Sequence, residues 1–497
     1  MLNFASQMNT IFIIIAVAVY SLFLFAISRW TVGRSRTPAS GQPQGANETF
    51  FRANRRAPWP MVAFGMVGAS ISGVTFVSVP GMVLTSQMTY LQVCLGFIVG
   101  YLIVAFVLLP LYYRLNLTTI YTYLGQRLGA RSYTTGAAFF LLSKMIGSAV
   151  KFYVVCLILQ QFVMSALGFP FGVTVVLMVL LIWLYTRRGG IGTLVFTDTF
   201  QTLCLFSALL LIIYKVMGTM DLSLTDTIDR LLADERSRVF VLDDWVSPRN
   251  FWKQLLSGAF IVVVMTGLDQ DMMQKNLTCR TLREAQKNMC TYGVAFLPAN
   301  LLFLSLGVLL AQWAASEGGI TMRGDELLSG FVAQQGGMAA VLFVIGIVAA
   351  SFSSADSALT SLTTSYCIDI CHREEDERLR KRTHITMCLV FAVVILFIHA
   401  VNSSSLIDTI YTIVSYTYGP LLGLFAFGLF TKRRVADGCV PYICVASPLI
   451  CYATDWFCQQ QFGYHFGYEL LLLNGLLTFL GLQLTSLTRK QDLTEVE

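Results

Sequence analysis

The sequence predicts an all-α integral membrane protein, because its composition and the length of its apolar segments both indicate that class. Of the 497 residues, 56% are apolar and only 12% are charged, about half the charged fraction of ordinary soluble domains. So few charges cannot cover a water-soluble fold. The lipid core is about 30 Å thick, so a spanning helix needs roughly 20 mostly apolar residues. That pattern recurs along the chain, which predicts a single membrane domain over 1–497.

The apolar segments predict about thirteen transmembrane helices. They cover residues 10–28, 59–83, 91–113, 133–165, 170–186, 190–215, 251–273, 288–314, 332–370, 383–401, 405–430, 436–457 and 467–487. The first segment has no basic residue before it and arginines after it, the reverse of a cleavable signal peptide. It is expected to remain as an extra N-terminal helix. The acidic segment 216–250 has little apolar periodicity and is expected to be a loop or a short surface helix.

The distribution of lysines and arginines indicates which loops face the cytoplasm. Most lysines and arginines fall in alternate loops, among them 29–58, 275–287 and 373–382, and the positive-inside rule places such loops in the cytoplasm of a cell-membrane protein. With an odd number of helices, the N-terminus is expected outside and the C-terminus in the cytoplasm. The net charge of +6 therefore does not indicate nucleic-acid binding.

Other function classes find little support in the chain. The twelve cysteines mostly lie inside apolar segments without metal-ligand spacing and are interpreted as small core residues. The sequence contains no GxxxxGK[ST] phosphate-binding motif. An ATP-driven pump and a sensor kinase are both disfavoured, and no catalytic residues or enzyme activity are expected.

The helix at 59–83 has an unusual composition. Between Gly65 and Gly81 it carries glycines and hydroxyl residues where leucines are expected. Helices interrupted in mid-membrane expose backbone carbonyls that can coordinate sodium, and such breaks recur in secondary transporters. The alternative is an unbroken helix whose small residues permit close packing, as expected of Gly96 and Gly100 in the next helix. The residues alone leave both interpretations open.

A polar strip runs along the helix at 332–370. The i, i+3 and i+4 spacing gathers Ala350, Ser353, Ser354 and Ser357 on one side, next to Asp356. A single serine in a membrane helix more often bonds the carbonyl one turn earlier than it binds an ion. Several hydroxyls around a carboxylate are harder to explain that way, because a mid-membrane carboxylate is costly unless paired or solvated.

A second acid, Asp198, lies about eight residues inside the helix at 190–215, roughly 12 Å from its start at the helical rise. The serine strip is expected to reach a similar depth. Sodium prefers such oxygen ligands, whereas soft transition metals prefer His or Cys. Alternatively, either acid is a structural partner of Lys144 or Lys151.

These segments together resemble the sodium:solute symporter family, the relatives of sodium/glucose cotransporters, over nearly the whole chain. The match is carried by the Gly-rich segment 65–81, by Gly189-Gly190 with Thr197-Asp198, and by the Ala-Ala-x-x-Ser-Ser motif at 349–354. The segment 266–275 and the Arg283-Glu284-Ala285 sequence are also similar to the family.

The resemblance implies an inverted-repeat fold of the leucine-transporter type. Its repeats would be 59–215 and 251–430, each beginning with a broken helix, and 436–487 would form two C-terminal helices. By the same resemblance, one sodium ion is held at Gly68, Ile71, Ala350, Ser353 and Ser354. A further sodium site would comprise Asp198, Asp356 and Ser357, although family members with that site usually carry a hydroxyl or apolar residue in place of Asp356.

The resemblance also implies a substrate site between the helices. Its candidate contacts are Ser70, Ser72, Thr75, Gln92, Lys151 and Asp269. Glucose-type members place an acid and an amide at the positions of Val74 and Thr75, which argues against ordinary hexose recognition. Lys151 is expected near the bilayer midplane, where a substrate carboxylate is a natural partner. A permanent pair with Asp198 or Asp269, or snorkelling along a cavity wall, is the alternative.

The expected function is sodium-coupled import of a small polar solute, with an organic acid or a sialate-type sugar acid favoured. Neutral sugars, osmolytes or vitamins are the alternative substrates. A membrane sensor or channel on the same scaffold is the alternative from another class. Sodium ions, the solute and the lipid bilayer are the expected partners, and the protein is expected to function as a monomer.

Overall fold

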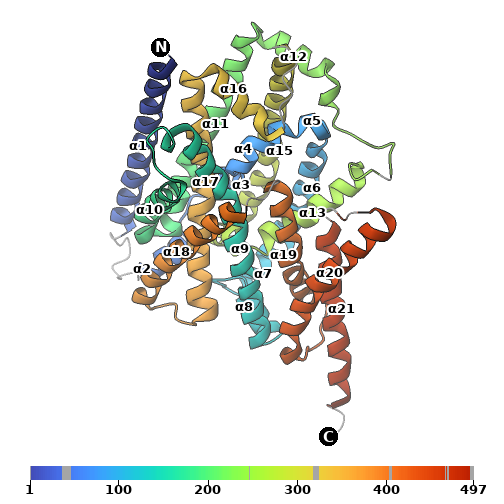
Figure 1. Cartoon of the computed structure of the whole chain (residues 1–497). Coiled ribbons are helices and arrows are strands. Elements are labelled where there is room, and N and C mark those ends of the chain that lie inside the picture. Colours follow the sequence, from blue (N-terminus) through green and yellow to red (C-terminus); the bar gives the residue numbers. More distant parts are fainter. Residues whose placement is uncertain are drawn as a thin grey trace.

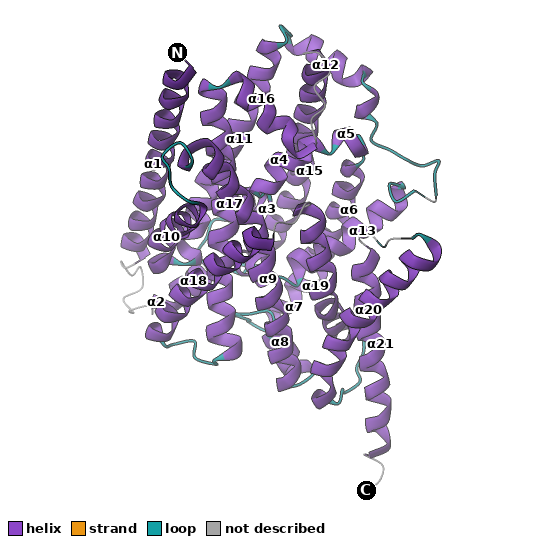
Figure 2. Ribbon diagram, viewed as in Figure 1, coloured by secondary structure: helices purple, strands orange, loops and turns teal. Residues whose placement is uncertain are grey.

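The computed structural model describes residues 2–35, 46–245, 247–316, 324–401, 406–464, 466 and 469–492. Within these ranges the ordered elements are helices and no β-strand occurs (Figure 2). An isolated parallel bridge joins Ala57 to Cys279. The all-α prediction is therefore confirmed for the described part of the chain.

The helices follow one another along the chain, and a long connection joins α12 to α13 (Figure 1). The first eleven are α1 (Leu2–Ser35), α2 (Ala46–Arg52), α3 (Trp59–Ser70), α4 (Gly73–Gly81), α5 (Val83–Ser86), α6 (Tyr90–Ile103), α7 (Leu109–Arg114), α8 (Thr122–Arg127), α9 (Ala130–Leu159), α10 (Phe171–Gly189) and α11 (Ile191–Thr219). They are followed by α12 (Leu224–Ala233), which lies within the acidic segment 216–250, and then by α13 (Phe251–Val262), α14 (Gln270–Asn276), α15 (Leu282–Ser316), α16 (Leu327–Gln335), α17 (Gly337–Ser365), α18 (Glu377–Val401), α19 (Leu406–Phe430), α20 (Val440–Phe462) and α21 (Glu469–Asp492).

The number of spans differs from the expected thirteen. Among the described residues, eight helices are long and apolar enough to cross a bilayer, and two bent helix pairs raise this to ten. The expected helices 170–186, 405–430 and 436–457 correspond to α10, α19 and α20, which are not among these spans. The apolar part of α10, Phe171–Arg187, is short. A count of thirteen is therefore not confirmed.

Two local features refine the expected boundaries. The acidic segment contains a surface helix, α12, whose first turn is closed by a capping box between Ser223 and Asp226. The hydrogen bonds from Ser223 lower the pKa of the exposed Asp226 carboxyl. The expected helix 332–370 begins within α16 and is interrupted at Gly336, where φ is +58°. This left-handed conformation favours glycine and separates α16 from α17.

Glycines allow two of the membrane helices to cross closely. A Cβ atom at Gly96 of α6 would overlap the Leu255 carbonyl oxygen, and one at Gly258 of α13 would overlap the Val93 carbonyl oxygen. Gly100 likewise faces the carbonyl oxygen of Ala259, at 2.5 Å from a built Cβ. The close packing expected at Gly96 and Gly100 is confirmed, because only glycine fits at such a backbone contact.

Helix α17 lies in the middle of the bundle (Figure 1). It packs against α11, α9 and α3, and also against α4 and α14. Most of its side chains are buried, including the serines and the aspartate of the polar strip, with Ser354 only partly so. The fold therefore brings the polar strip of α17 against both bent helix pairs.

Candidate functional site

The first bent pair is α3 and α4, whose axes differ by 62°. Ile71 and Ser72 lie between them in extended backbone conformations. The Ser72 hydroxyl accepts a hydrogen bond from the Thr75 amide at 3.4 Å, and the Ser72 amide donates to Thr75 Oγ1 at 3.3 Å. This capping box starts the new helix. Of the two interpretations of this segment, the structure has the broken helix.

The second bent pair is α13 and α14, with an angle of 72°. The α13 axis continues through a π-helical turn, Val263–Gly267, before the chain breaks. Asp269 then caps α14, because its Oδ1 accepts from the amides of Asp271 at 2.8 Å and Met272 at 3.4 Å. Both breaks that the resemblance implies are thus present.

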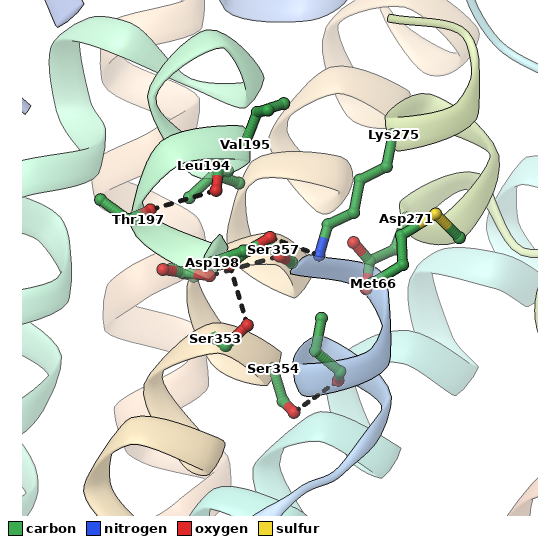
Figure 3. Close-up of polar contacts among 12 residues, drawn as sticks. Met66, Leu194, Val195, Thr197, Asp198, Asp271, Lys275, Ser353, Ser354 and Ser357 are labelled. Atoms are coloured by element: carbon green, nitrogen blue, oxygen red, sulfur yellow. Dashed lines mark hydrogen bonds and ion pairs between the residues drawn. The ribbon is translucent and has the colours of Figure 1, made fainter. Parts of the chain in front are cut away.

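The serine strip of α17 meets the end of α3. The Ser354 hydroxyl donates to the Ala69 carbonyl oxygen at 2.8 Å and approaches the Ala350 carbonyl oxygen at 3.1 Å (Figure 3). The carbonyls in the last turn of a helix lack partners within that helix. Gly68 and Ile71 flank this point, and the Ile71 amide donates to the Gly68 carbonyl oxygen at 3.1 Å. The structure therefore places Gly68, Ile71, Ala350 and Ser354 at one contact, whereas the hydroxyl of Ser353, the fifth expected residue, donates to Asp198.

Asp198 of α11 contacts the same strip from another side. Its Oδ1 accepts from the Ser353 hydroxyl at 2.8 Å, and its Oδ2 lies 2.8 Å from Lys275 Nζ (Figure 3). The Asp198 and Lys275 side chains are 2% and 3% exposed. In the described structure Asp198 pairs with Lys275 and with neither Lys144 nor Lys151. The alternative that Lys144 or Lys151 is the structural partner of Asp198 is therefore wrong.

Sequence reasoning missed Lys275 because it was counted with the basic cytoplasmic loop 275–287. It belongs instead to the last turn of α14 and is buried. Its place as the last residue of the family-like segment 266–275 was the available signal.

Asp356 has different neighbours from Asp198. It is fully buried, its Oδ2 accepts from the Tyr185 hydroxyl at 2.6 Å, and its Oδ1 accepts from the Ser357 hydroxyl at 3.3 Å. Tyr185 belongs to α10. The expected pairing of Asp356 with Lys144 or Lys151 is wrong, because Lys144 pairs elsewhere and neither lysine contacts it in the described structure.

A cavity lies next to the two breaks. All of the expected substrate contacts except one line it: Ser70, Ser72, Thr75, Lys151 and Asp269. Gln92 is not among the lining residues. Its amide nitrogen donates to the Arg249 carbonyl oxygen at 3.0 Å, and its Oε1 accepts from the Val241 amide at 3.1 Å. Gln92 therefore joins α6 to the segment between α12 and α13.

The Asp269 carboxylate contacts several donors within the protein. Lys144 Nζ lies 3.1 Å from Asp269 Oδ2 and 2.8 Å from Asp271 Oδ2. The Tyr418 hydroxyl donates to Asp269 Oδ2 at 2.6 Å. With its capping role included, both Asp269 oxygens have protein donors, which favours a structural role over substrate contact.

Lys151 lies two turns beyond Lys144 on α9. Both lysines are partly buried and line the cavity, but they differ in their partners. In the described part of the chain it forms no ion pair with Asp198 or Asp269, whose charges are matched by Lys275 and Lys144. The expected alternative of a permanent pair for Lys151 is therefore wrong. Lys151 is therefore a partly buried lysine on the cavity wall.

Aromatic side chains complete the cavity wall and were not predicted. Tyr101 donates its hydroxyl to that of Tyr292 at 2.8 Å, and the Tyr292 hydroxyl is hydrogen-bonded to Ser70. Phe97 and Phe296 line the same wall. Apolar walls with a few fixed polar groups are typical of small-molecule sites. These aromatic residues lie in ordinary apolar helices, so the sequence offered no signal for them.

Comparison with known proteins identifies the family. The model of the sodium:solute symporter family matches residues 50–441. The chain belongs to this family. It is therefore a sodium-coupled symporter and a multi-pass membrane protein, with sodium as the coupling ion.

The symporter has curated relatives with different solutes. The sodium/sialic acid symporter NanT of Aliivibrio fischeri (strain ATCC 700601 / ES114) is 24% identical over 412 residues, covering 79% of this chain and 80% of the relative. The human sodium/iodide cotransporter is 24% identical over 418 residues, covering 78% of this chain and 62% of the relative. The relatives thus share the coupling ion but differ in solute.

The fold of the symporter also matches a solved structure. A sodium-coupled sialic acid symporter in a substrate-bound, outward-open state has a TM-score of 0.79 at 20% identity. The match covers 96% of this chain and 97% of that chain. Both chains therefore have the same overall fold.

Proposed function

We propose that this symporter imports a small organic anion, with a sialate-type sugar acid favoured. The observation that carries the proposal is the Lys151 ammonium, which lines the cavity and forms no ion pair with Asp198 or Asp269. A charged group away from water is costly without an opposite charge. A substrate carboxylate entering the cavity supplies that charge.

The relatives support an anionic solute. NanT is described as a sialic acid symporter, and the human relative as an iodide cotransporter. Both solutes are anions at neutral pH. Ser70, Ser72 and Thr75 place hydroxyls on the same cavity, and hydroxyls suit the polar groups of a sugar acid.

We assign the coupling sodium ion to the contact between α3 and α17. Its ligands are the carbonyl oxygens of Gly68, Ile71 and Ala350 and the hydroxyls of Ser353 and Ser354. The short contacts from Ser354 to Ala69 and Ala350 support this assignment. Carbonyl and hydroxyl oxygens are the hard donors that such a cation prefers. We assign no ion to the further set Asp198, Asp356 and Ser357, because Lys275 already pairs with Asp198.

Transport by alternating access requires two parts that move relative to one another. The expected repeats 59–215 and 251–430 each begin with a bent pair, α3–α4 and α13–α14, which supports their assignment as the two halves. The extra helix at 10–28 and the two helices within 436–487 lie outside these halves. The start of α1 and the end of α21 lie at opposite ends of the molecule (Figure 1), which supports termini on opposite sides of the plasma membrane. The basic loops favour an outside N-terminus and a cytoplasmic C-terminus. The working unit of this proposal is the monomer.

Uptake into sealed proteoliposomes tests the proposal. An inward sodium gradient is expected to concentrate a labelled sialic acid inside the vesicles, and collapse of the gradient should release it. A neutral sugar of similar size is the matched solute control. Preferential accumulation of the neutral sugar would identify the alternative substrate class, and equilibration without accumulation would identify a channel.

A further inference from the structure

Lys275 lies where a second sodium ion is expected. Its ammonium nitrogen is 2.8 Å from Asp198 Oδ2, and both side chains are almost completely buried. Figure 3 shows the Lys275 side chain extending from α14 toward Asp198 and the serines of α17. The resemblance assigns Asp198 to a second sodium site, but in this chain that carboxylate already has a cation.

The other expected ligands of a second sodium ion are also engaged. The remaining Asp198 oxygen, Oδ1, accepts from Ser353 at 2.8 Å. The Ser357 hydroxyl is directed to Asp356 Oδ1 at 3.3 Å, and Asp356 Oδ2 accepts from Tyr185 at 2.6 Å. A sodium ion bound to Asp198 would have to displace the Lys275 ammonium or lie beside it. Displacement would leave a buried ammonium unpaired, and proximity would place two positive charges together in a low-dielectric region.

A tethered cation has a further advantage over a free one. Lys275 is attached to α14, so its ammonium reaches Asp198 at an effective concentration set by the short side chain and not by the sodium concentration in solution. The donor set at Asp198 therefore does not fit a second sodium ion while Lys275 is present.

We propose that Lys275 is a built-in cation that takes the place of a second sodium ion, so that one sodium ion is bound and moved with each solute molecule. This inference rests on the proposed function for the position of the first sodium ion at Ser354 and Ala69. It adds a stoichiometry to that function and a residue that determines it.

Equilibrium binding of radioactive sodium to purified protein tests the inference without any solute. The unmodified protein is expected to bind one ion, and Lys275→Met to bind two. Lys275→Arg is the matched control, because it keeps the charge and should still bind one ion. Two ions in the unmodified protein would overturn the inference, as would a single ion in a folded Lys275→Met protein.

Loss of Lys275 strands the buried Asp198, so Lys275→Met can fold poorly at low sodium. In that case the thermal stability decides, because a sodium ion at Asp198 replaces the missing charge. Sodium should then raise the melting temperature of Lys275→Met by a larger increment than that of the unmodified protein, whereas choline should not. Equal increments for the two proteins would contradict the inference. Failure of solute uptake in proteoliposomes, with the sodium count unchanged, would contradict only the proposed function.

Discussion

Ser354 of α17 donates its hydroxyl to the carbonyl oxygen of Ala69, 2.8 Å away and 285 residues earlier in the chain. This contact joins the serine strip to the end of α3, where the helix is interrupted. A helix end supplies carbonyl oxygens without intrahelical partners, and the strip supplies hydroxyls. The sodium assignment depends on this meeting of two elements from opposite halves of the sequence.

The first prediction concerns these hydroxyls. Ser353→Ala and Ser354→Ala each remove one proposed sodium ligand, while alanine keeps the helix intact because it is the best helix former. Loss of a polar contact to a charged group costs about 1.5–3 kcal/mol. The sodium concentration for half-maximal uptake should therefore rise roughly ten- to a hundredfold.

Ser361→Ala is the matched control for both variants. Ser361 lies on the same helix, and its hydroxyl donates to the Ala358 carbonyl oxygen at 2.9 Å. The sodium dependence of uptake by the Ser361→Ala protein should match that of the unmodified protein. Unchanged sodium dependence of uptake in both Ser353→Ala and Ser354→Ala, at normal expression, would show that these hydroxyls do not bind the sodium ion.

The second prediction concerns stability at the second helix break. Lys144 contacts the carboxylates of both Asp269 and Asp271, and its side chain is 13% exposed. Lys144→Met would leave these buried acids without their cation and should destabilise the protein by about 3–5 kcal/mol. Chemical denaturation of purified protein in detergent measures this loss, with Lys144→Arg as the charge-preserving control. A Lys144→Met protein as stable as the unmodified one would show that the ion pair contributes nothing.

Features encoded by local sequence could be predicted. The apolar segments predicted the helices, and the glycine-rich and hydroxyl-rich segment at 65–81 indicated a break, although it did not exclude a packed, continuous helix. The number of spans was less predictable. Segments such as 170–186 are helical in the structure, but whether a short apolar helix crosses the bilayer depends on tilt and on its neighbours.

The partners of the charged residues could not be predicted, because they depend on which helices pack together. Lys144 and Lys151 lie seven residues apart on α9, yet only Lys144 reaches the acids of α14. Lys275 was assigned to a loop because it follows an apolar segment and precedes a basic one. In the structure α14 turns inward after the break and buries it against Asp198. The 72° bend between α13 and α14 belongs to the tertiary structure and could not be predicted from the local sequence.

The third prediction tests the close crossing of α6 and α13. A Cβ at Gly96 would meet the carbonyl oxygen of Leu255, which as backbone cannot easily move aside. Gly96→Ala should therefore destabilise the protein by about 1–3 kcal/mol, as measured by thermal unfolding in detergent. At Gly218 of α11 an added Cβ has no neighbour within 4 Å, so Gly218→Ala should be neutral or slightly stabilising. Equal stability of the two variants would contradict a tight crossing.

The last prediction concerns Lys151, on which the proposed substrate class depends. Lys151 lines the cavity, and the cations that neutralise Asp198 and Asp269 are Lys275 and Lys144. Lys151→Gln should therefore leave no buried acid unpaired, and the variant should fold normally. A charge-assisted hydrogen bond to a carboxylate contributes about 1.5–3 kcal/mol, so binding of the acid should weaken roughly ten- to a hundredfold. Binding of the corresponding neutral amide should hardly change.

Ligand-induced thermal stabilisation measures the affinities for the acid and the amide on the same purified protein. Lys215→Gln, at an exposed lysine of α11, is the matched control. An equal loss of affinity for the acid and the amide would show that Lys151 does not contact the carboxylate.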